Sequence, residues 1–221
     1  MGSDNLFHKR RAKVADRLER RKAKRSSYEK VLIVCEGEKT EPNYFEDLIL
    51  FHKLNTANVE VDGSCGSSPR SVFERAIELW HSEDKKGDAF DRVYCVFDKD
   101  SHTTYEETVR NISKQEPKGI FHAAISVPCF EYWVLLHFNY TTKPYAATET
   151  SSIGSEVLKD LIHVMPNYSK GCKNIYSELH PQLEFAKHNA RRSLEHAKDN
   201  HSDNPTTNIH DLVQYLEGLK N

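Results

Sequence analysis

Two apolar runs that each end in an acidic residue are the feature that most constrains the fold of this chain. Residues 31–35, with the sequence VLIVC, lead directly into Glu36, and residues 93–97, with the sequence VYCVF, lead into Asp98. A continuous run of about five such residues is typical of a strand buried in a parallel sheet. Open α/β folds bind ligands at the carboxyl ends of these strands. The sequence therefore predicts an α/β fold with Glu36 and Asp98 at its ligand-binding edge.

Strand and helix patterns alternate from residue 31 to about residue 140. The predicted strands cover 31–35, 58–61, 92–97 and 120–126, and the helices between them begin at an N-cap Thr40, at Pro69 after an N-cap Ser68, and near Thr103. Strands separated by single helices imply right-handed crossovers. We therefore expect a mostly parallel sheet flanked by helices.

Both ends of the chain differ from this α/β pattern. Beyond residue 150 the apolar spacing is helical only, and residues 198–208 are polar and contain proline, which predicts a loop before the last helix. Residues 1–30 hold eleven Lys/Arg and four Asp/Glu, a net charge of +7, so the rest of the chain, whose total is −2, has −9. The expected organisation is a basic N-terminal arm (1–30), an α/β core (31–140) and a helical C-terminal extension (141–221).

The basic arm is suited to contact nucleic-acid phosphates, because clustered Lys and Arg side chains displace counterions from the backbone. The candidate substrate-binding residues are Arg10, Arg11, Arg20, Arg21, Lys22, Lys24 and Arg25. A merely solvated tail and a protein partner are the alternatives that the same charges leave open.

Composition excludes several classes of protein. There is no apolar stretch that could cross a bilayer and no secretory apolar region, and the five cysteines form no CxxC pair, so we expect a cytoplasmic protein with reduced thiols and no membrane partner. The twelve histidines lack the spacing of a zinc site. Without a GxxxxGK[ST] or GxGxxG loop, the chain alone is not expected to hydrolyse ATP or bind a dinucleotide.

Asp98 and Asp100 are two residues apart, so in an extended chain their carboxylates point to one side and Lys99 points away. Together with Glu36 they would repel one another strongly unless a cation intervenes. Oxygen ligands suit Mg²⁺ or Mn²⁺, and paired metal sites in phosphoryl transfer activate water and stabilise the leaving oxygen. Lys39 would offset charge on the phosphate.

Acids near strand ends also occur without a metal. Acidic residues favour helix N-termini, which accounts for Glu41 and in part for Glu38, but poorly for acids that follow two separate buried strands. A receiver-like phosphoacceptor domain also gathers acids at strand ends. The helical C-terminal region and the basic arm fit that class less well.

A third segment of interest covers residues 126–138. In this segment Pro128 ends the fourth predicted strand, and the helix that follows is apolar on nearly all of its faces. That helix should be buried, so Glu131 and His137 both need partners. The structural interpretation is that each side chain forms a local hydrogen bond. The functional one is that Glu131 adds a metal ligand or orients water.

Three segments together resemble the RloB-like family: residues 33–45 (IVCEGEKTEPNYF), residues 128–138 (PCFEYWVLLHF) and residues 204–210 (NPTTNIH). A strand that ends in Glu-Gly and a later one that ends in Asp-x-Asp also resemble the Toprim catalytic core. That core is shared by topoisomerases, primases, and OLD-type and small RNA-processing nucleases.

The resemblance implies a Toprim-like sheet in a bacterial or archaeal anti-phage defence protein, often encoded beside an ATPase. It places Glu36, Asp98 and Asp100 at the metal-binding positions, and it matches Glu131 without fixing its role. The family name implies no settled substrate.

These observations predict a Mg²⁺- or Mn²⁺-dependent endonuclease of anti-phage defence, with RNA such as tRNA favoured over DNA. The expected catalytic residues are Glu36, Asp98, Asp100, Lys39 and Glu131, with Lys99 as an alternative phosphate contact. A topoisomerase is disfavoured because a small core lacks the domains for strand passage. The alternative from another class is a non-catalytic, metal-binding regulatory subunit, on whose basic arm or helical region a partner ATPase would dock. A homo-oligomer is compatible with either function.

Overall fold

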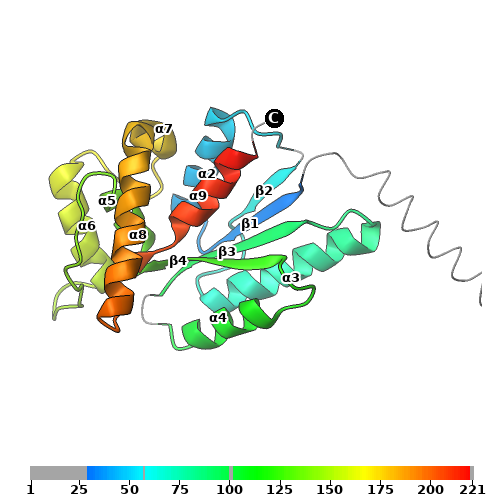
Figure 1. The fold of residues 1–221 in the computed structure, drawn as a ribbon, viewed down its shortest axis with the longest axis horizontal. Helices are drawn as coiled ribbons and strands as arrows, with labels where there is room; N and C mark the ends of the chain where they lie inside the picture. The colour runs from blue at the N-terminus through cyan, green and yellow to red at the C-terminus, as the bar shows by residue number, and fades with distance from the viewer. Residues whose placement is uncertain (1–28, 57, 100–101, 220–221) are drawn as a thin grey trace, which may run out of the picture.

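A five-stranded sheet lies at the centre of the protein, with helices on both of its faces (Figure 1). The computed structural model describes residues 29–56, 58–99 and 102–219. All candidate substrate-binding residues of the basic arm, and Asp100, lie outside these described residues.

The strands confirm the predicted α/β topology. Strands β1 (Val31–Cys35), β2 (Val59–Asp62), β3 (Arg92–Asp98) and β4 (Phe121–Val127) run parallel in the order β2-β1-β3-β4. All of β1 and the five central residues of β3 are buried, as their apolar sequences predict. Because β1 and β3 are neighbours in parallel register, Glu36, which follows β1, and Asp98, which ends β3, reach the same edge of the sheet.

Helices cover the two faces of the sheet unequally. The helical elements are α2 (Thr40–Phe51), α3 (Pro69–Lys86), α4 (Tyr105–Lys114), α5 (Phe130–Leu135), α6 (Ile153–Val164), α7 (Ile175–Leu179), the 3₁₀ helix η1 (His180–Gln182), α8 (Leu183–Asp199) and α9 (Ile209–Gly218). Figure 1 shows α3 and α4 on one face and α2 and α9 on the other. Within the described ranges, no helix has both the length and the hydropathy to span a bilayer.

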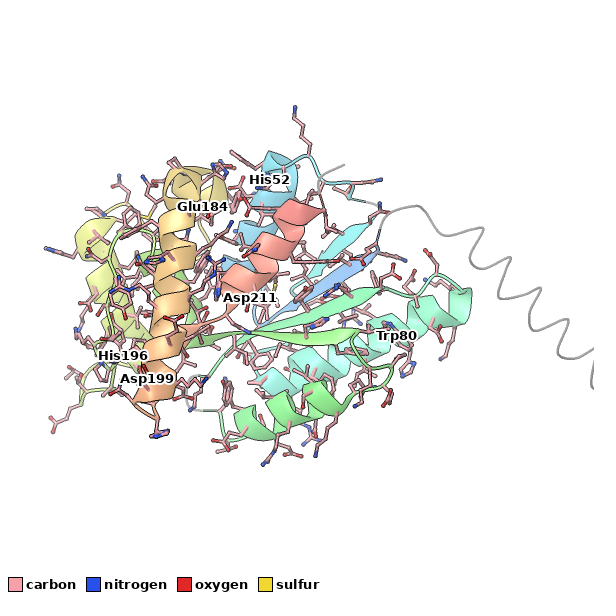
Figure 2. The ribbon with its side chains drawn as sticks, viewed as in Figure 1. His52, Trp80, Glu184, His196, Asp199 and Asp211 are labelled. Atoms are coloured by element: carbon pink, nitrogen blue, oxygen red, sulfur yellow. The ribbon has the colours of Figure 1, made fainter. Side chains whose placement is uncertain are left out.

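Side chains that alternate along each strand divide the core in two. On one face Leu32 and Val34 pack with Trp80 of α3, and on the other Ile33 packs with side chains of α2 and α9. Figure 2 shows Trp80 and His52 on opposite sides of the sheet. The larger core cluster combines residues before and after position 140, so the C-terminal helices bury their apolar faces against the same sheet.

Two helix starts test the predicted capping. Ser68 is the N-cap of α3, where its Oγ accepts a hydrogen bond from the Ser71 N–H at 3.2 Å, as predicted. The prediction that Thr40 caps α2 is wrong by one residue. Lys39 is the N-cap and makes no side-chain capping bond, while Thr40 is the first helical residue.

The prediction that residues 198–208 form only a loop is also wrong. Helix α8 extends to Asp199, and strand β5 (Thr206–Thr207) pairs antiparallel with the end of β4. Beside it, the Asn208 side chain accepts from the Ile125 N–H at 2.5 Å and donates to the Ala123 carbonyl at 2.9 Å. The amide of Asn208 therefore takes the place of a peptide group and continues the pairing along the edge of β4.

The cysteines agree with the prediction of reduced thiols. All five are free, and Cys35, Cys95 and Cys129 are buried. The first two lie in β1 and β3, where they pack as small apolar side chains.

His137 follows the buried helix α5 and is 1% exposed. Its Nδ1 donates to the Trp133 carbonyl at 3.0 Å, which confirms the predicted local hydrogen bond, and its Nε2 has no hydrogen-bond partner among the described residues. Burial outweighs the hydrogen bonds to the backbone and lowers the pKa of His137 to about 4. The folded protein therefore holds this imidazole neutral.

We expect His137 to make the fold sensitive to acid. An unfolded histidine takes up a proton near pH 6.5, so the stability that the neutral imidazole contributes is complete above that pH and is lost as the pH falls toward 4. His137→Phe should remove about 2–3 kcal/mol of the stability loss between pH 7 and 4.5 in urea unfolding. The exposed control His188→Gln should leave the loss unchanged; an equal loss in His137→Phe and wild type would contradict this account.

Candidate active site

A pocket of about 450 Å³ lies at the carboxyl ends of β1 and β3. It is lined by Glu36, Gly37, Glu38, Lys39, Thr40, Glu41, Asp98, Phe130, Glu131 and Lys170. Each described residue of the predicted catalytic set is in this lining, together with Glu41 and Lys170, to which the sequence assigns no catalytic role. Five acidic and two basic side chains thus meet in one pocket.

Glu36 is positioned by the strand pairing itself. Its backbone N–H continues the ladder by donating to the Val96 carbonyl at 2.8 Å. Its carboxylate accepts from the Asp98 backbone N–H at 3.1 Å and lies 3.1 Å from the His102 Nε2. The next residue, Gly37, has a φ of +92°, a left-handed conformation that glycine adopts without strain and that turns the chain from strand to helix.

Asp98 ends β3 next to Glu36. Burial raises the pKa of Asp98 well above its usual range, and the charges of Glu41, Glu131 and Glu36 raise it further, opposed in part by the Phe130 backbone. Carboxylates that follow β1, end β3 and lie in the first turns of α2 and α5 are therefore close enough to repel one another. They form the kind of site that a cation or a proton stabilises.

Glu41 lies in the first turn of α2 and is 6% exposed. Burial raises the pKa of this carboxyl to about 8; its own backbone N–H opposes the shift, and the charges of Glu131 and Glu36 add to it. The preference of acids for helix N-termini explains its place in the helix but not its burial among other acids. The feature of the sequence that could have indicated a role for Glu41 in the site is its position close to Glu36 in a short acidic segment.

Glu131 lies in the first turn of α5 and is 2% exposed. Its Oε1 lies 3.1 Å from the Lys170 Nζ and accepts a hydrogen bond from the Tyr168 hydroxyl at 3.4 Å. Both of these partners come from the loop between α6 and α7. The predicted local hydrogen bond is also present, to the Cys129 side chain, but it is not the only contact of Glu131. The sequence does not reveal Lys170, which stands in a polar segment without apolar periodicity or acidic neighbours.

The two lysines predicted as phosphate contacts lie in different places. Lys39 is exposed at the start of α2 and lines the pocket. Lys99 is not part of the lining, and its ammonium is paired with Asp203. The geometry therefore favours Lys39 over Lys99 as a group that could reach a bound phosphate.

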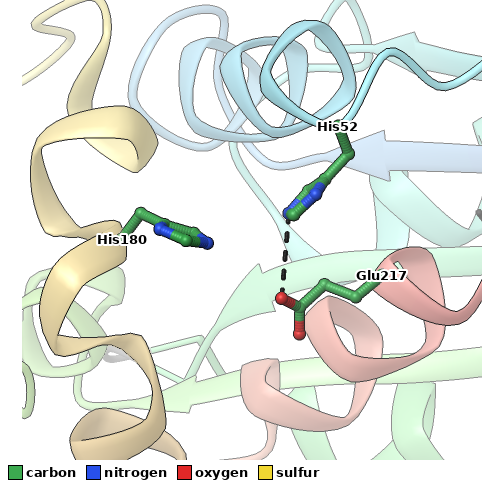
Figure 3. Close-up of side chains that lie close together, drawn as sticks. All are labelled: His52, His180 and Glu217. Atoms are coloured by element: carbon green, nitrogen blue, oxygen red, sulfur yellow. Dashed lines mark ion pairs between the residues drawn. The ribbon is translucent and has the colours of Figure 1, made fainter.

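A closer group of potential metal ligands lies elsewhere. Ligand atoms of His52, His180 and Glu217 are all within 4.8 Å of one another (Figure 3), and within the described part of the chain no other three His, Cys, Asp or Glu side chains meet so closely. However, the His52 Nε2 is 2.5 Å from the Tyr176 hydroxyl, and Glu217 pairs with Lys187. We therefore interpret these three residues as a structural cluster of polar side chains that joins the C-terminal end of α2 to η1 and α9.

Comparison with protein families gives a match over most of the chain. The family model described as RloB-like protein matches residues 31–216, a range that contains all the residues of the pocket. No curated protein and no solved structure matches the chain significantly.

Proposed function

This chain belongs to the RloB-like family, and on that premise we propose that it is a divalent-cation-dependent endonuclease of anti-phage defence that favours RNA, such as tRNA, over DNA. The family suggests a defence-associated, nuclease-like role. The observation that supports the specific chemistry is the convergence of Glu36, Glu41, Asp98 and Glu131 with Lys39 and Lys170 in one pocket. The parallel sheet is consistent with a Toprim-like core, which forms part of the proposal.

The donor set of the pocket fits Mg²⁺ or Mn²⁺. Glu36 and Asp98 would hold the cation, because hard cations prefer carboxylate oxygens. Asp100 is proposed as a further ligand on the basis of the sequence alone. Burial, and after it the charges of neighbouring carboxylates, raise the pKa of Asp98 and of Glu41, so a cation bound among these groups would favour their ionised forms. When bound, such a cation activates water and stabilises the leaving oxygen of a phosphodiester.

The residues of the chain would orient the reaction. The hydrogen bond from the Asp98 backbone N–H orients the Glu36 carboxylate toward the end of β3, where the second proposed ligand stands. Lys39, at the exposed rim, would contact a phosphate oxygen of the substrate. The arm residues Arg10, Arg11, Arg20, Arg21, Lys22, Lys24 and Arg25 are proposed to bind the strand away from the pocket.

The test is cleavage of total tRNA, single-stranded RNA and duplex DNA by the full chain with Mg²⁺ or Mn²⁺. We compare wild type with Glu36→Gln, which keeps a hydrogen-bond acceptor, and with Glu60→Gln, an exposed carboxylate of β2 outside the pocket. Wild type and Glu60→Gln should give the same defined fragments, and chelator or Glu36→Gln should abolish them.

Two outcomes would contradict the proposal. Equal cleavage by Glu36→Gln and wild type would exclude the pocket as the active site. If no substrate is cleaved even when a candidate ATPase partner is added, while Mn²⁺ still binds, the protein is better described as a metal-binding regulatory subunit.

A further inference from the structure

The loop that bears Lys170 is held firmly against the start of α2. The Asn43 side chain donates to the Gly171 carbonyl at 2.7 Å. Gly171 has a φ of +73°, and a Cβ at this position would lie 2.9 Å from the Cβ of Lys39. This close approach requires glycine, and it sets the neighbouring Lys170 at the pocket beside residues of α2.

The ion pair between Lys170 and Glu131 is asymmetric. The Glu131 side chain is 2% exposed, whereas that of Lys170 is 56% exposed. The carboxylate is therefore enclosed by the protein, whereas more than half of the Lys170 side chain is open to solvent where it lines the pocket. Burial lowers the pKa of Lys170, but the charge of Glu131 and the hydrogen bond to it raise the pKa on balance, so the side chain stays charged.

A buried carboxylate such as Glu131 needs a counter-ion, but the counter-ion is not required to be a lysine. A divalent cation held by Glu36 and Asp98 would supply positive charge to the same group of acids and would repel the ammonium. Lysine is a point charge on a flexible stem, so it can move to another anion without rebuilding the pocket. The anion that the proposed reaction brings to this pocket is a phosphate of the nucleic acid.

We propose that Lys170 exchanges partners: its ammonium neutralises Glu131 when the pocket lacks a divalent cation and contacts a substrate phosphate when the cation is bound. This inference rests on the proposed function and assigns a substrate-binding residue to it. The proposal predicts opposite effects of one substitution on cation affinity and on cleavage. Removing the ammonium strengthens cation binding, because a competing positive charge is gone, and weakens cleavage, because a phosphate contact is lost.

The experiment uses the full chain and three variants. Lys170→Met removes the charge and keeps a flexible stem, Lys170→Arg keeps the charge, and Lys173→Met is the control on an exposed lysine of the same loop. Mn²⁺ affinity is measured by calorimetry without nucleic acid, and cleavage is measured on the substrate class found for wild type.

Lys170→Met should bind Mn²⁺ about tenfold more tightly, the effect of removing one nearby like charge. Its cleavage should fall about 10²-fold in kcat/KM, as for the loss of one charged contact to the reacting group. Lys170→Arg should keep most of the wild-type cleavage and affinity, because it keeps the charge, and Lys173→Met should behave as wild type.

The outcomes separate this inference from the function on which it rests. If wild type binds Mn²⁺ and cleaves, but Lys170→Met has unchanged or weaker Mn²⁺ affinity, the exchange of partners is wrong and the nuclease stands. If wild type neither binds Mn²⁺ nor cleaves, both fail together.

Discussion

Replacing Asp98 by asparagine is expected to remove nearly all cleavage while leaving the protein folded. Burial and the charges of Glu41, Glu131 and Glu36 raise the pKa of Asp98, so in the cation-free protein the ionised carboxylate is unfavourable. Asparagine keeps the shape and removes the charge, so the cation-free variant should be no less stable than wild type. Cleavage should fall by about 10³-fold, the scale of losing a preorganised electrostatic group at the reacting centre.

Thermal unfolding with and without Mn²⁺ measures the effect of the same substitution independently of activity. A cation that binds the folded protein raises the midpoint of wild type by mass action, and Asp98→Asn should lose that shift. Asp199→Asn is the matched control, because Asp199 is exposed at the end of α8 (Figure 2). An equal Mn²⁺ shift in Asp98→Asn and wild type would show that Asp98 does not hold the cation.

The second large effect is expected on stability, from Glu217→Ala. Lys187 of α8 is 5% exposed at its side chain and pairs with two carboxylates, Glu217 of α9 and Glu184. Glu217 is 20% exposed, while Glu184 is 83% exposed. Removing Glu217 leaves a buried ammonium with only a solvated partner, which should cost about 3–5 kcal/mol of unfolding free energy.

Glu184→Ala is the internal comparison for this prediction. It removes an exposed partner of the same ammonium and should cost at most about 1 kcal/mol. The double variant Lys187→Met, Glu217→Ala should recover much of the loss, because it leaves no unpaired charge. Urea unfolding at pH 7 measures all of them; equal costs for Glu217→Ala and Glu184→Ala would disprove the burial argument.

The sequence predicts the central strands and two site residues well because the same local pattern encodes both. A buried parallel strand needs an apolar run, and the first polar residue after the run necessarily stands at the sheet edge. Glu36 and Asp98 therefore reach the pocket wall as expected. The predicted N-cap of α2 is wrong because Lys39 caps without a side-chain bond, so the usual preference for threonine points to the wrong residue.

The features that the sequence does not predict depend on contacts between distant segments. The partner of Glu131 stands 39 residues later in the chain, at Lys170. Strand β5 has only two residues, too few to show an alternating pattern, and its pairing is set by β4, where Ser126 pairs with Thr207. Such pairings follow from the assembled topology and not from local propensity. The burial of Glu41 among other acids is likewise a property of the folded chain.

The pairing of Asn208 with β4 has a consequence for the order of events during synthesis. Until residue 208 has left the ribosome, the Ile125 N–H and the Ala123 carbonyl lack the partner that they have in the folded protein. The nascent chain therefore exposes an unpaired strand edge, which favours chaperone contact.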